Sequence, residues 1–201
     1  SKLVICPTDG TVSEIGRIRQ NHIVQAKKHG YNVVDLLGGN AEDAASFING
    51  SFVTIYLAPG DYHRVHMPIK GKLQKTTHVK GKLFSVNPLA VRYIPSLFAR
   101  NERLVCFFET EYGPMVIVMV GAMIVASIET TWDGSIDYSP KNLLSKTFYH
   151  PHILLERGEE MGFFRLGSTV ILLFGPCCID WSSKLMQAST VKMGQIIGYP
   201  K

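Results

Sequence analysis

Short stretches of β-branched and aromatic residues, separated by glycine, proline and asparagine, recur along the whole chain. Such stretches favour the half-buried surface of a β-strand over the single apolar stripe of a helix. Two turn signals, Asp9-Gly10 and Asn49-Gly50, lie at or just before stretches of this kind. The pattern predicts strands at residues 10–18, 52–57, 103–109, 115–128 and 169–174.

Helical patterns are few in this sequence. Residues 41–48 fit about two turns of helix, and residues 182–188 fit about one or two. The chain shows neither an internal repeat nor a linker, so we expect a single catalytic domain over residues 1–201. The predicted fold is mainly β (α+β): an antiparallel barrel or sandwich of short strands with a few short helical insertions.

Composition supports a folded domain rather than a disordered or membrane-spanning chain. With 46% hydrophobic and 18% charged residues, the sequence has the apolar side chains for a sizeable core. The longest apolar run, residues 115–128, is shorter than the roughly 20 residues that cross a bilayer as a helix. A buried strand or a pair of strands explains this run better, and the protein could still lie on a membrane surface.

Charge narrows the class of partner. The net charge of +5 suits an anionic partner, although a solvated basic face is the simpler explanation. Without an arginine-rich block or finger motif, an anionic membrane surface is favoured over a nucleic acid. The four cysteines form no CxxC pair, which indicates a reducing compartment rather than a disulfide framework.

The densest cluster of chemically active side chains lies in residues 58–68. Asp61, His63 and His66 fall within six residues, flanked by proline and glycine, just after a predicted strand. Three interpretations stay open: polar residues without chemistry, a zinc site lacking an obvious third ligand, or a general base. A base oriented by an aspartate needs a nucleophile from elsewhere in the chain.

Gly167-Ser168 supplies that nucleophile. The pair precedes the predicted strand at residues 169–174 and does not fit the GxSxG motif of the α/β-hydrolases. A deprotonated Ser168 hydroxyl can add to the Gly167 carbonyl and convert the peptide bond into an ester. Elimination then releases the upstream chain as a carboxylate, and the remaining dehydroalanine hydrolyses to a pyruvoyl group with loss of ammonia. The ketone of that group can condense with a substrate amine and accept the electrons left when CO2 departs.

Several segments together resemble the bacterial-type phosphatidylserine decarboxylases, which depend on a pyruvoyl group. The resemblance runs in family order over almost the whole chain. Its segments are Pro7-Thr8-Asp9-Gly10-Thr11-Val12, residues 56–68, Leu83-Phe84-Ser85-Val86-Asn87, residues 97–103 and Leu166-Gly167-Ser168-Thr169.

The resemblance implies a role for five residues. Ser168 matches the residue that becomes the pyruvoyl cofactor, after self-cleavage into residues 1–167 (β subunit) and 168–201 (α subunit). His66 matches the base that activates this serine, and His63 matches the histidine of the decarboxylation step, as proton donor. Asp9 and Asp61 match two acidic positions of the self-cleavage triad, and which of them orients His66 stays open. No metal is expected.

The resemblance also implies a substrate, a location and an assembly. The expected substrate is phosphatidylserine, converted to phosphatidylethanolamine and CO2, by a peripheral enzyme on the cytoplasmic face of the inner membrane. A homodimer of α/β heterodimers is expected. Family members carry an amphipathic helical segment upstream of the part that begins here at Ser1, so we expect that a preceding segment was removed.

Two other classes of function remain as alternatives. A Ser-His-Asp hydrolase would use the same residues on an external ester or amide and stay uncut. A non-catalytic β module would not depend on Ser168 or His66. Outside these residues, residues 100–103 are most simply a solvated turn. The alternative is that their apolar neighbours in residues 89–98 form a lipid-facing loop.

Overall fold

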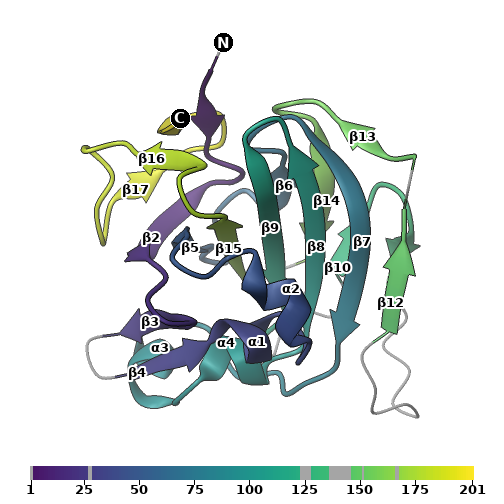
Figure 1. Ribbon diagram of the computed structural model, residues 1–201. Helices are drawn as coiled ribbons and strands as arrows, with labels where there is room; N and C mark the ends of the chain where they lie inside the picture. The colour runs from purple at the N-terminus through teal and green to yellow at the C-terminus, as the bar shows by residue number, and fades with distance from the viewer. Residues whose placement is uncertain (1, 27–28, 123–127, 136–145, 151, 166–167) are drawn as a thin grey trace.

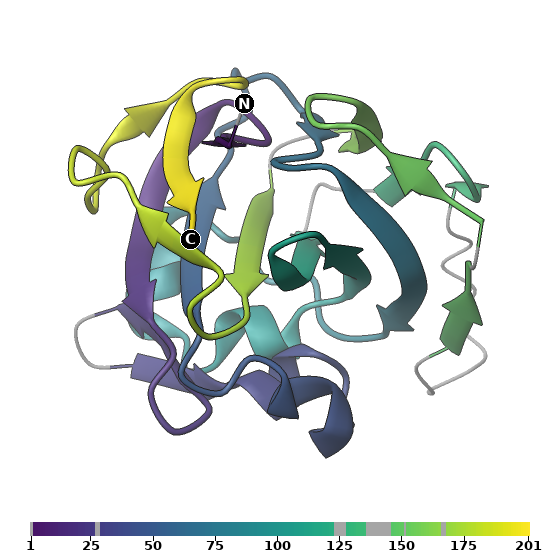
Figure 2. The same cartoon turned by 45° about the horizontal axis from the view of Figure 1, so that its top comes forward.

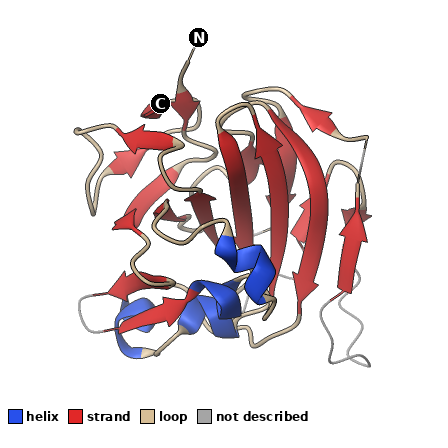
Figure 3. Ribbon diagram, in the orientation of Figure 1, coloured by secondary structure: helices blue, strands red, loops and turns tan. Residues whose placement is uncertain are grey.

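The computed structural model describes residues 2–26, 29–122, 128–135, 146–150, 152–165 and 168–201. It is strand-rich, with short helices gathered at one end of the sheets (Figures 1 and 3). The largest sheet has the open order β12-β7-β8-β9-β15-β5-β2-β17, with β13 paired to β7, and its neighbouring strands are antiparallel. Its strands are β2 (Gly10–Arg17), β5 (Ser51–Tyr56), β7 (Gly71–Val79), β8 (Arg103–Thr110), β9 (Gly113–Val120), β12 (Lys146–Tyr149), β13 (Leu154–Leu155), β15 (Thr169–Phe174) and β17 (Thr190–Val191).

Three smaller sheets complete the β structure. One has the order β11-β10-β14-β6, the second β1-β18-β16, and the third is the β3-β4 hairpin. Their strands are β6 (Arg64–His66), β10 (Ile128–Thr130), β11 (Gly134–Ser135), β14 (Glu160–Phe164), β1 (Val4–Ile5), β16 (Ile179–Trp181), β18 (Ile196–Pro200), β3 (His22–Ala26) and β4 (His29–Asn32). The expected mainly β fold with antiparallel sheets is confirmed.

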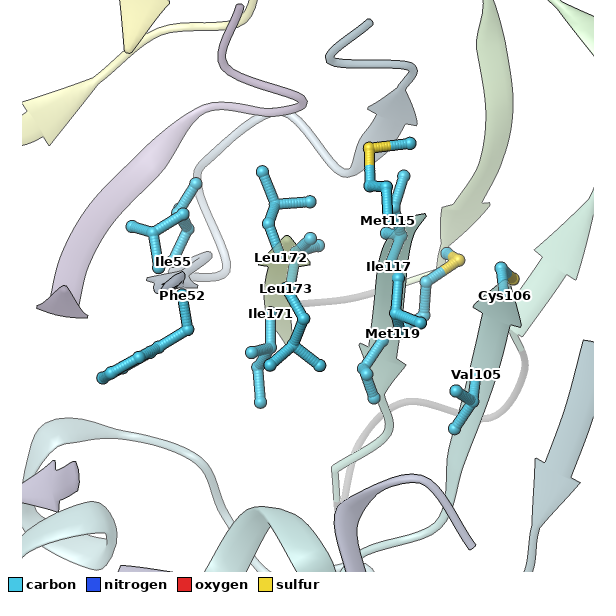
Figure 4. Packing of buried hydrophobic residues seen from close by; sticks show 14 of the residues in the cluster. Phe52, Ile55, Val105, Cys106, Met115, Ile117, Met119, Ile171, Leu172 and Leu173 are labelled. Atoms are coloured by element: carbon cyan, nitrogen blue, oxygen red, sulfur yellow. The ribbon is translucent and has the colours of Figure 1, made fainter. Parts of the chain in front are cut away.

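The core lies along the middle of the largest sheet. Strand β15 pairs with β5 on one side and β9 on the other, and all six of its residues are buried. A strand covered on both faces is apolar at every position rather than at alternate ones, as the Val-Ile-Leu-Leu-Phe run of β15 is. Figure 4 shows Ile171, Leu172 and Leu173 between the side chains of β5 and those of β9. The strands predicted at residues 10–18, 52–57, 103–109 and 169–174 are confirmed, and the run 115–128 contains the end of β9 and the start of β10.

The helices are short: α1 (Val33–Leu36), α2 (Ala41–Ala45), α3 (Pro88–Tyr93) and α4 (Leu97–Arg100). The helix expected at residues 41–48 is confirmed as α2, which begins after the Asn40 cap. The helix expected at residues 182–188 is wrong. The Ala188 N–H donates instead to the Val12 carbonyl of β2, and Ala188 has a left-handed φ of 66°. Pairing with the sheet therefore overrides the local helical preference there.

Residues 101–103 are buried and only Arg100, the last residue of α4, is exposed, so the expected solvated turn at residues 100–103 is wrong. Asn101 is 0% exposed and Arg103 is 2% exposed. The Arg103 guanidinium donates to the carbonyls of Asp35, Leu36 and Asn101. Glu102 is also buried, and its carboxylate contacts His78 Nε2 at 2.8 Å. Side chains that look solvated in the sequence are buried here because backbone carbonyls and a histidine satisfy them.

Asn101→Ala should destabilise the fold strongly. The Asn101 Nδ2 donates to the carbonyls of Phe84 (2.8 Å) and Gly121 (2.9 Å), and its Oδ1 accepts from the Phe84 N–H (3.1 Å). Alanine would leave these buried groups unpaired, so we expect the free energy of unfolding to fall by about 3 kcal/mol. Urea titration measures it best in a Ser168→Ala background, where the chain should stay intact.

A matched control is Asn87→Ala. Asn87 is exposed and caps α3 through a 2.8 Å bond from the Ala90 N–H, so its loss should cost about 1 kcal/mol. Equal losses for the two variants would contradict the structural role assigned to Asn101.

Candidate active site

Two connections between strands meet at the predicted site. One joins β5 to β6 and carries the histidine block, and the other joins β14 to β15 and carries Ser168. The backbones of Leu57 and Ser168 exchange two hydrogen bonds (2.8 and 3.1 Å), and the Phe164 N–H donates to the His63 carbonyl (3.0 Å). Because β6 also pairs with β14, the two connections are held together at both ends.

Residues 7–9 lie against the same block. The Thr8 hydroxyl donates to the Tyr62 carbonyl (3.1 Å), and the His66 N–H donates to the Pro7 carbonyl (2.8 Å). Hydrogen bonds thus join the segment that contains Asp9 to the segment that contains both histidines, although they are far apart in sequence.

Ser168 is completely buried at the start of the central strand β15. Its hydroxyl donates to the Val120 carbonyl of the neighbouring strand β9. The next residue, Thr169, has a buried hydroxyl that lacks a hydrogen-bond partner among the described residues. Gly167, on the other side of the predicted cut, and Leu166 lie outside the described residues.

His66 is buried and held at both ring nitrogens. Nδ1 lies 2.9 Å from the Gly158 carbonyl, and Nε2 lies 2.9 Å from the Tyr62 hydroxyl, whose ring stacks on the imidazole. A carbonyl can only accept, so Nδ1 carries the hydrogen and the Nε2 of the neutral ring presents its lone pair to Tyr62. Nε2 is therefore the basic nitrogen of His66.

His63 presents an unsatisfied nitrogen. Its Nε2 donates to the Pro59 carbonyl at 3.1 Å, which leaves Nδ1 as the acceptor in the neutral ring. Nδ1 is buried and has no partner among the described residues. A buried polar atom without a partner is costly, and its lone pair is available to a ligand or a proton.

Asp9 and Asp61 both accept hydrogen bonds from groups other than His66. The Asp61 carboxylate accepts from the Ala58 N–H (2.8 Å) and so closes the turn at residues 58–61. Asp9 accepts from Lys192 Nζ (2.7 Å) and from the Met193 N–H (2.9 Å). In the described part of the chain the ring of His66 bonds to Tyr62 and Gly158, so an Asp–His pair is not closed in this conformation.

The Asp9–Lys192 pair gives a pH-dependent stability. Burial alone would raise the pKa of Asp9, but the hydrogen bonds from Lys192 and Met193 outweigh it and lower the pKa. A folded-state pKa below the unfolded value of about 3.9 stabilises the protein above that pH, and the effect is lost as the pH falls through the folded value. Because Lys192 is largely exposed, Asp9→Asn should lower the free energy of unfolding at pH 7 by less than about 1 kcal/mol.

Urea titration of the Ser168→Ala background at several pH values measures this difference. It should stay constant from pH 7 to about pH 5 and shrink below about pH 4. The matched control is Asp180→Asn, which removes the ion pair with Lys201. Asp180 is more exposed than Asp9, so its loss should lower the free energy of unfolding by less. A difference that persists unchanged at about pH 3 would contradict a role for the Asp9 charge.

A cavity of about 860 Å³ is lined by residues of β2, β3, β5 and α3. Its lining includes Thr11 and Tyr56, which pair in register, and Tyr56 also pairs with Thr169. Arg92 and Tyr93 of α3 line it as well, so it extends from β2 and β5 to α3, and none of Ser168, His63 and His66 is among its lining residues. Burial raises the pKa of Glu14, another lining residue, and such perturbed groups are common in ligand-binding cavities.

Among the residues that the structure describes, no three His, Cys, Asp or Glu side chains are grouped to hold a metal ion. The described helices include none that is both long enough and apolar enough to cross a membrane.

Sequence analysis missed the partners of His66. Tyr62 lies inside the quoted block, but nothing in the sequence indicates that its hydroxyl turns toward the imidazole four residues later. The Gly158 carbonyl comes from a turn ninety-two residues away, where Gly158 adopts a φ of 83°. A Gly-Glu turn before β14 is visible in the sequence, but its contact depends on how β6 and β14 pair.

Comparison with known proteins agrees with the motifs. The sequence model of the phosphatidylserine decarboxylase family matches residues 1–199. Proteins named phosphatidylserine decarboxylase proenzyme from Bordetella avium, Ectopseudomonas mendocina and Azotobacter vinelandii are 53%, 51% and 52% identical to this chain, respectively. These alignments cover 97–98% of this chain and 67–69% of the relatives. The predicted resemblance is confirmed: the chain belongs to the phosphatidylserine decarboxylase family.

Proposed function

We propose that this chain is the proenzyme of a phosphatidylserine decarboxylase that cuts itself between Gly167 and Ser168. The observation that carries the proposal is the position of Ser168. It is buried at the start of the central strand and paired through its backbone with Leu57, the residue just before the histidine block. Family membership favours this function over the uncut hydrolase, which would use the same serine and histidines.

The surroundings of Ser168 fit a pyruvoyl group made in place. The site is buried and flanked by apolar strands, and two buried polar atoms nearby, Thr169 Oγ1 and His63 Nδ1, lack partners among the described residues. These atoms could bind the group or the substrate. A pyruvoyl ketone supplies an electron sink for the pair of electrons released when a carboxylate leaves as CO2.

Self-cleavage needs one base and one nucleophile. Ser168 Oγ adds to the Gly167 carbonyl as His66 Nε2 accepts its proton, and the Ser168 nitrogen leaves that carbonyl as an amine. Elimination then removes the Cα proton of Ser168, breaks its Cβ–Oγ bond and releases residues 1–167 as a carboxylate. The remaining dehydroalanine tautomerises to an imine, which one water hydrolyses to the ketone and ammonia. His66 Nε2 must first turn away from the Tyr62 hydroxyl, or receive the proton through it.

Both products should remain in one molecule after the cut. Strand β15 lies between β5 and β9, and β17 and β18 pair with β2 and β1 of the N-terminal part. Figure 2 shows the C-terminal strands in yellow beside the purple N-terminal strand. The Asp9–Lys192 pair joins the same two parts.

His63 has the better geometry for the decarboxylation step. Its unpartnered Nδ1 can hold a proton, and the mechanism needs a donor for the carbanion formed when CO2 leaves. The cavity beside Tyr56 offers space for the serine head group, with Glu14 and Arg92 as charged partners. In this proposal the enzyme works as a homodimer of cut chains on the cytoplasmic face of the inner membrane.

The test is a product analysis with phosphatidylserine in mixed detergent micelles. The proposal expects CO2 and phosphatidylethanolamine in equal amounts, inhibited by a hydrazine that captures ketones. Free fatty acid or phosphoserine without CO2 would favour the hydrolase instead and overturn the proposal.

A further inference from the structure

The exposed side of α3 combines apolar side chains with basic ones. Leu89 and Tyr93 are 67% and 66% exposed and lie four residues apart, so they point to the same side of the helix. Residues 79–101 contain four basic side chains and no acidic one. We define the α3 surface as Leu83, Leu89 and Tyr93 with Lys82, Arg92 and Arg100, all of them exposed.

This surface is held rigidly by a buried glutamine. Gln25 is 1% exposed, and its Nε2 donates to the carbonyls of Val91 (2.8 Å) and Ile94 (2.7 Å). Its Oε1 accepts from the Leu97 N–H (2.8 Å). These bonds fix α3 and the start of α4 to β3, so the exposure of Leu89 and Tyr93 is imposed by the fold.

The cations of the α3 surface are available to an anionic partner. Among the described residues, none of Lys82, Arg92 and Arg100 forms an ion pair. The Arg92 guanidinium lies 5.8 Å from the ring centre of Tyr93, and that of Arg100 lies 4.8 Å from the ring centre of Phe84. Aromatic and basic side chains side by side are typical of the interface between a membrane and water.

A second surface with exposed apolar residues lacks this charge pattern. Phe148, Tyr149 and Leu154 of β12 and β13 are exposed. Of the neighbouring cations, Lys70 and Lys75 are paired with Glu156 and Asp43, and Lys72, which lies opposite Leu154, stands in register with the acidic Glu109. Complementarity to an anionic bilayer therefore favours the α3 surface.

The α3 surface also adjoins the cavity that Thr11 and Tyr56 line. Arg92 and Tyr93 belong to both, and Tyr56 lines the cavity where β5 and β15 pair. We infer that the α3 surface docks the enzyme on an anionic lipid bilayer, with Leu89 inserted among the acyl chains, so that a lipid head group enters the cavity beside Arg92. This inference rests on the proposed function for the identity of that lipid.

Binding can be measured by co-sedimentation with vesicles of phosphatidylglycerol and phosphatidylcholine, because phosphatidylglycerol is anionic but carries no carboxylate to lose. Leu89→Glu should weaken partitioning about tenfold or more, because it replaces the apolar side chain that the inference inserts among the acyl chains with a charged one. Lys82→Glu should weaken it by about fivefold for each charge unit changed. The matched control, Leu154→Glu on the second surface, should bind these vesicles like the parent. Vesicles of phosphatidylcholine alone should bind the parent and all three variants weakly.

Two further readouts separate docking from chemistry. Leu89→Glu should cut itself normally and decarboxylate a soluble short-chain phosphatidylserine at the parental rate, while its rate on vesicles falls with binding. Failure of the parent to release CO2 from either substrate would refute the proposed function and leave the sedimentation result to decide docking.

Three outcomes would overturn the docking inference. The first is parental binding by Leu89→Glu, and the second is loss of binding by Leu154→Glu alone. The third is loss of an oligomer by Leu89→Glu without loss of vesicle binding, which would assign the surface to a second copy of the chain.

Discussion

Replacing Ser168 with alanine should leave one uncut chain that releases no CO2 above background. In the proposed mechanism, alanine removes both the nucleophile and the oxygen whose elimination creates the ketone, so neither step has a substitute. The Ser168 hydroxyl donates to the Val120 carbonyl, and losing that bond costs only about 1 kcal/mol. That cost is small against the 5–15 kcal/mol typical of a domain, so the variant should fold. Denaturing electrophoresis and a CO2 assay measure the two effects.

Ser51→Ala is the matched control for this prediction. Ser51 is another buried serine, at the start of β5, and it should cut and decarboxylate like the parent. Cutting of Ser168→Ala at the same position would show that Ser168 does not attack the chain. An uncut Ser168→Ala protein that still decarboxylates would remove Ser168 as the source of the cofactor.

Replacing each histidine with alanine should separate the two steps of the reaction. His66→Ala should slow self-cleavage by about 10²–10⁴-fold, because the basic Nε2 is lost. His63→Ala should still cut, because the proposal assigns the base in that step to His66, but CO2 release should fall by a similar factor. The rate of precursor loss and the CO2 released per cut chain are measured separately.

A suitable control is His22→Ala, which changes an exposed histidine in the β3–β4 hairpin. It should leave both rates unchanged. Efficient cutting of His66→Ala would rule out its role as the base. Equal loss of both steps in the two variants would show that the histidines do not divide the work in this way.

The strands of the core could be predicted because their sequence pattern reports burial directly. After Thr169, the β15 residues are all apolar, as expected of a strand covered on both faces, and the turn signal Asp9-Gly10 stands at the start of β2. Elements that depend on distant partners were not predictable. Strand β6 has only three residues and is defined by its pairing with β14, and α3 and α4 are held by hydrogen bonds from Gln25.

The candidate site, like the fold, was predictable where it depends on residue type and not where it depends on distant contacts. Chemistry that depends on residue type was visible: two imidazoles beside a carboxylate, and a glycine-serine pair before a strand. Geometry that depends on the fold was not. Arg103 was expected in a solvated turn because charged side chains usually lie in water, yet three backbone carbonyls satisfy it in the core. The roles of Asp9, Asp61, His63, His66 and Ser168 remain predictions for mutagenesis.

The most direct test of the central claim is the intact mass of the purified chain under denaturing conditions, before and after incubation at neutral pH. Self-cleavage predicts two species, residues 1–167 and residues 168–201, with the second lighter than its encoded sequence by the mass of one ammonia. It also predicts that the two elute together under native conditions, because β15 stays between β5 and β9. A single mass equal to the encoded chain that never changes, in a sample that decarboxylates phosphatidylserine, would contradict the account.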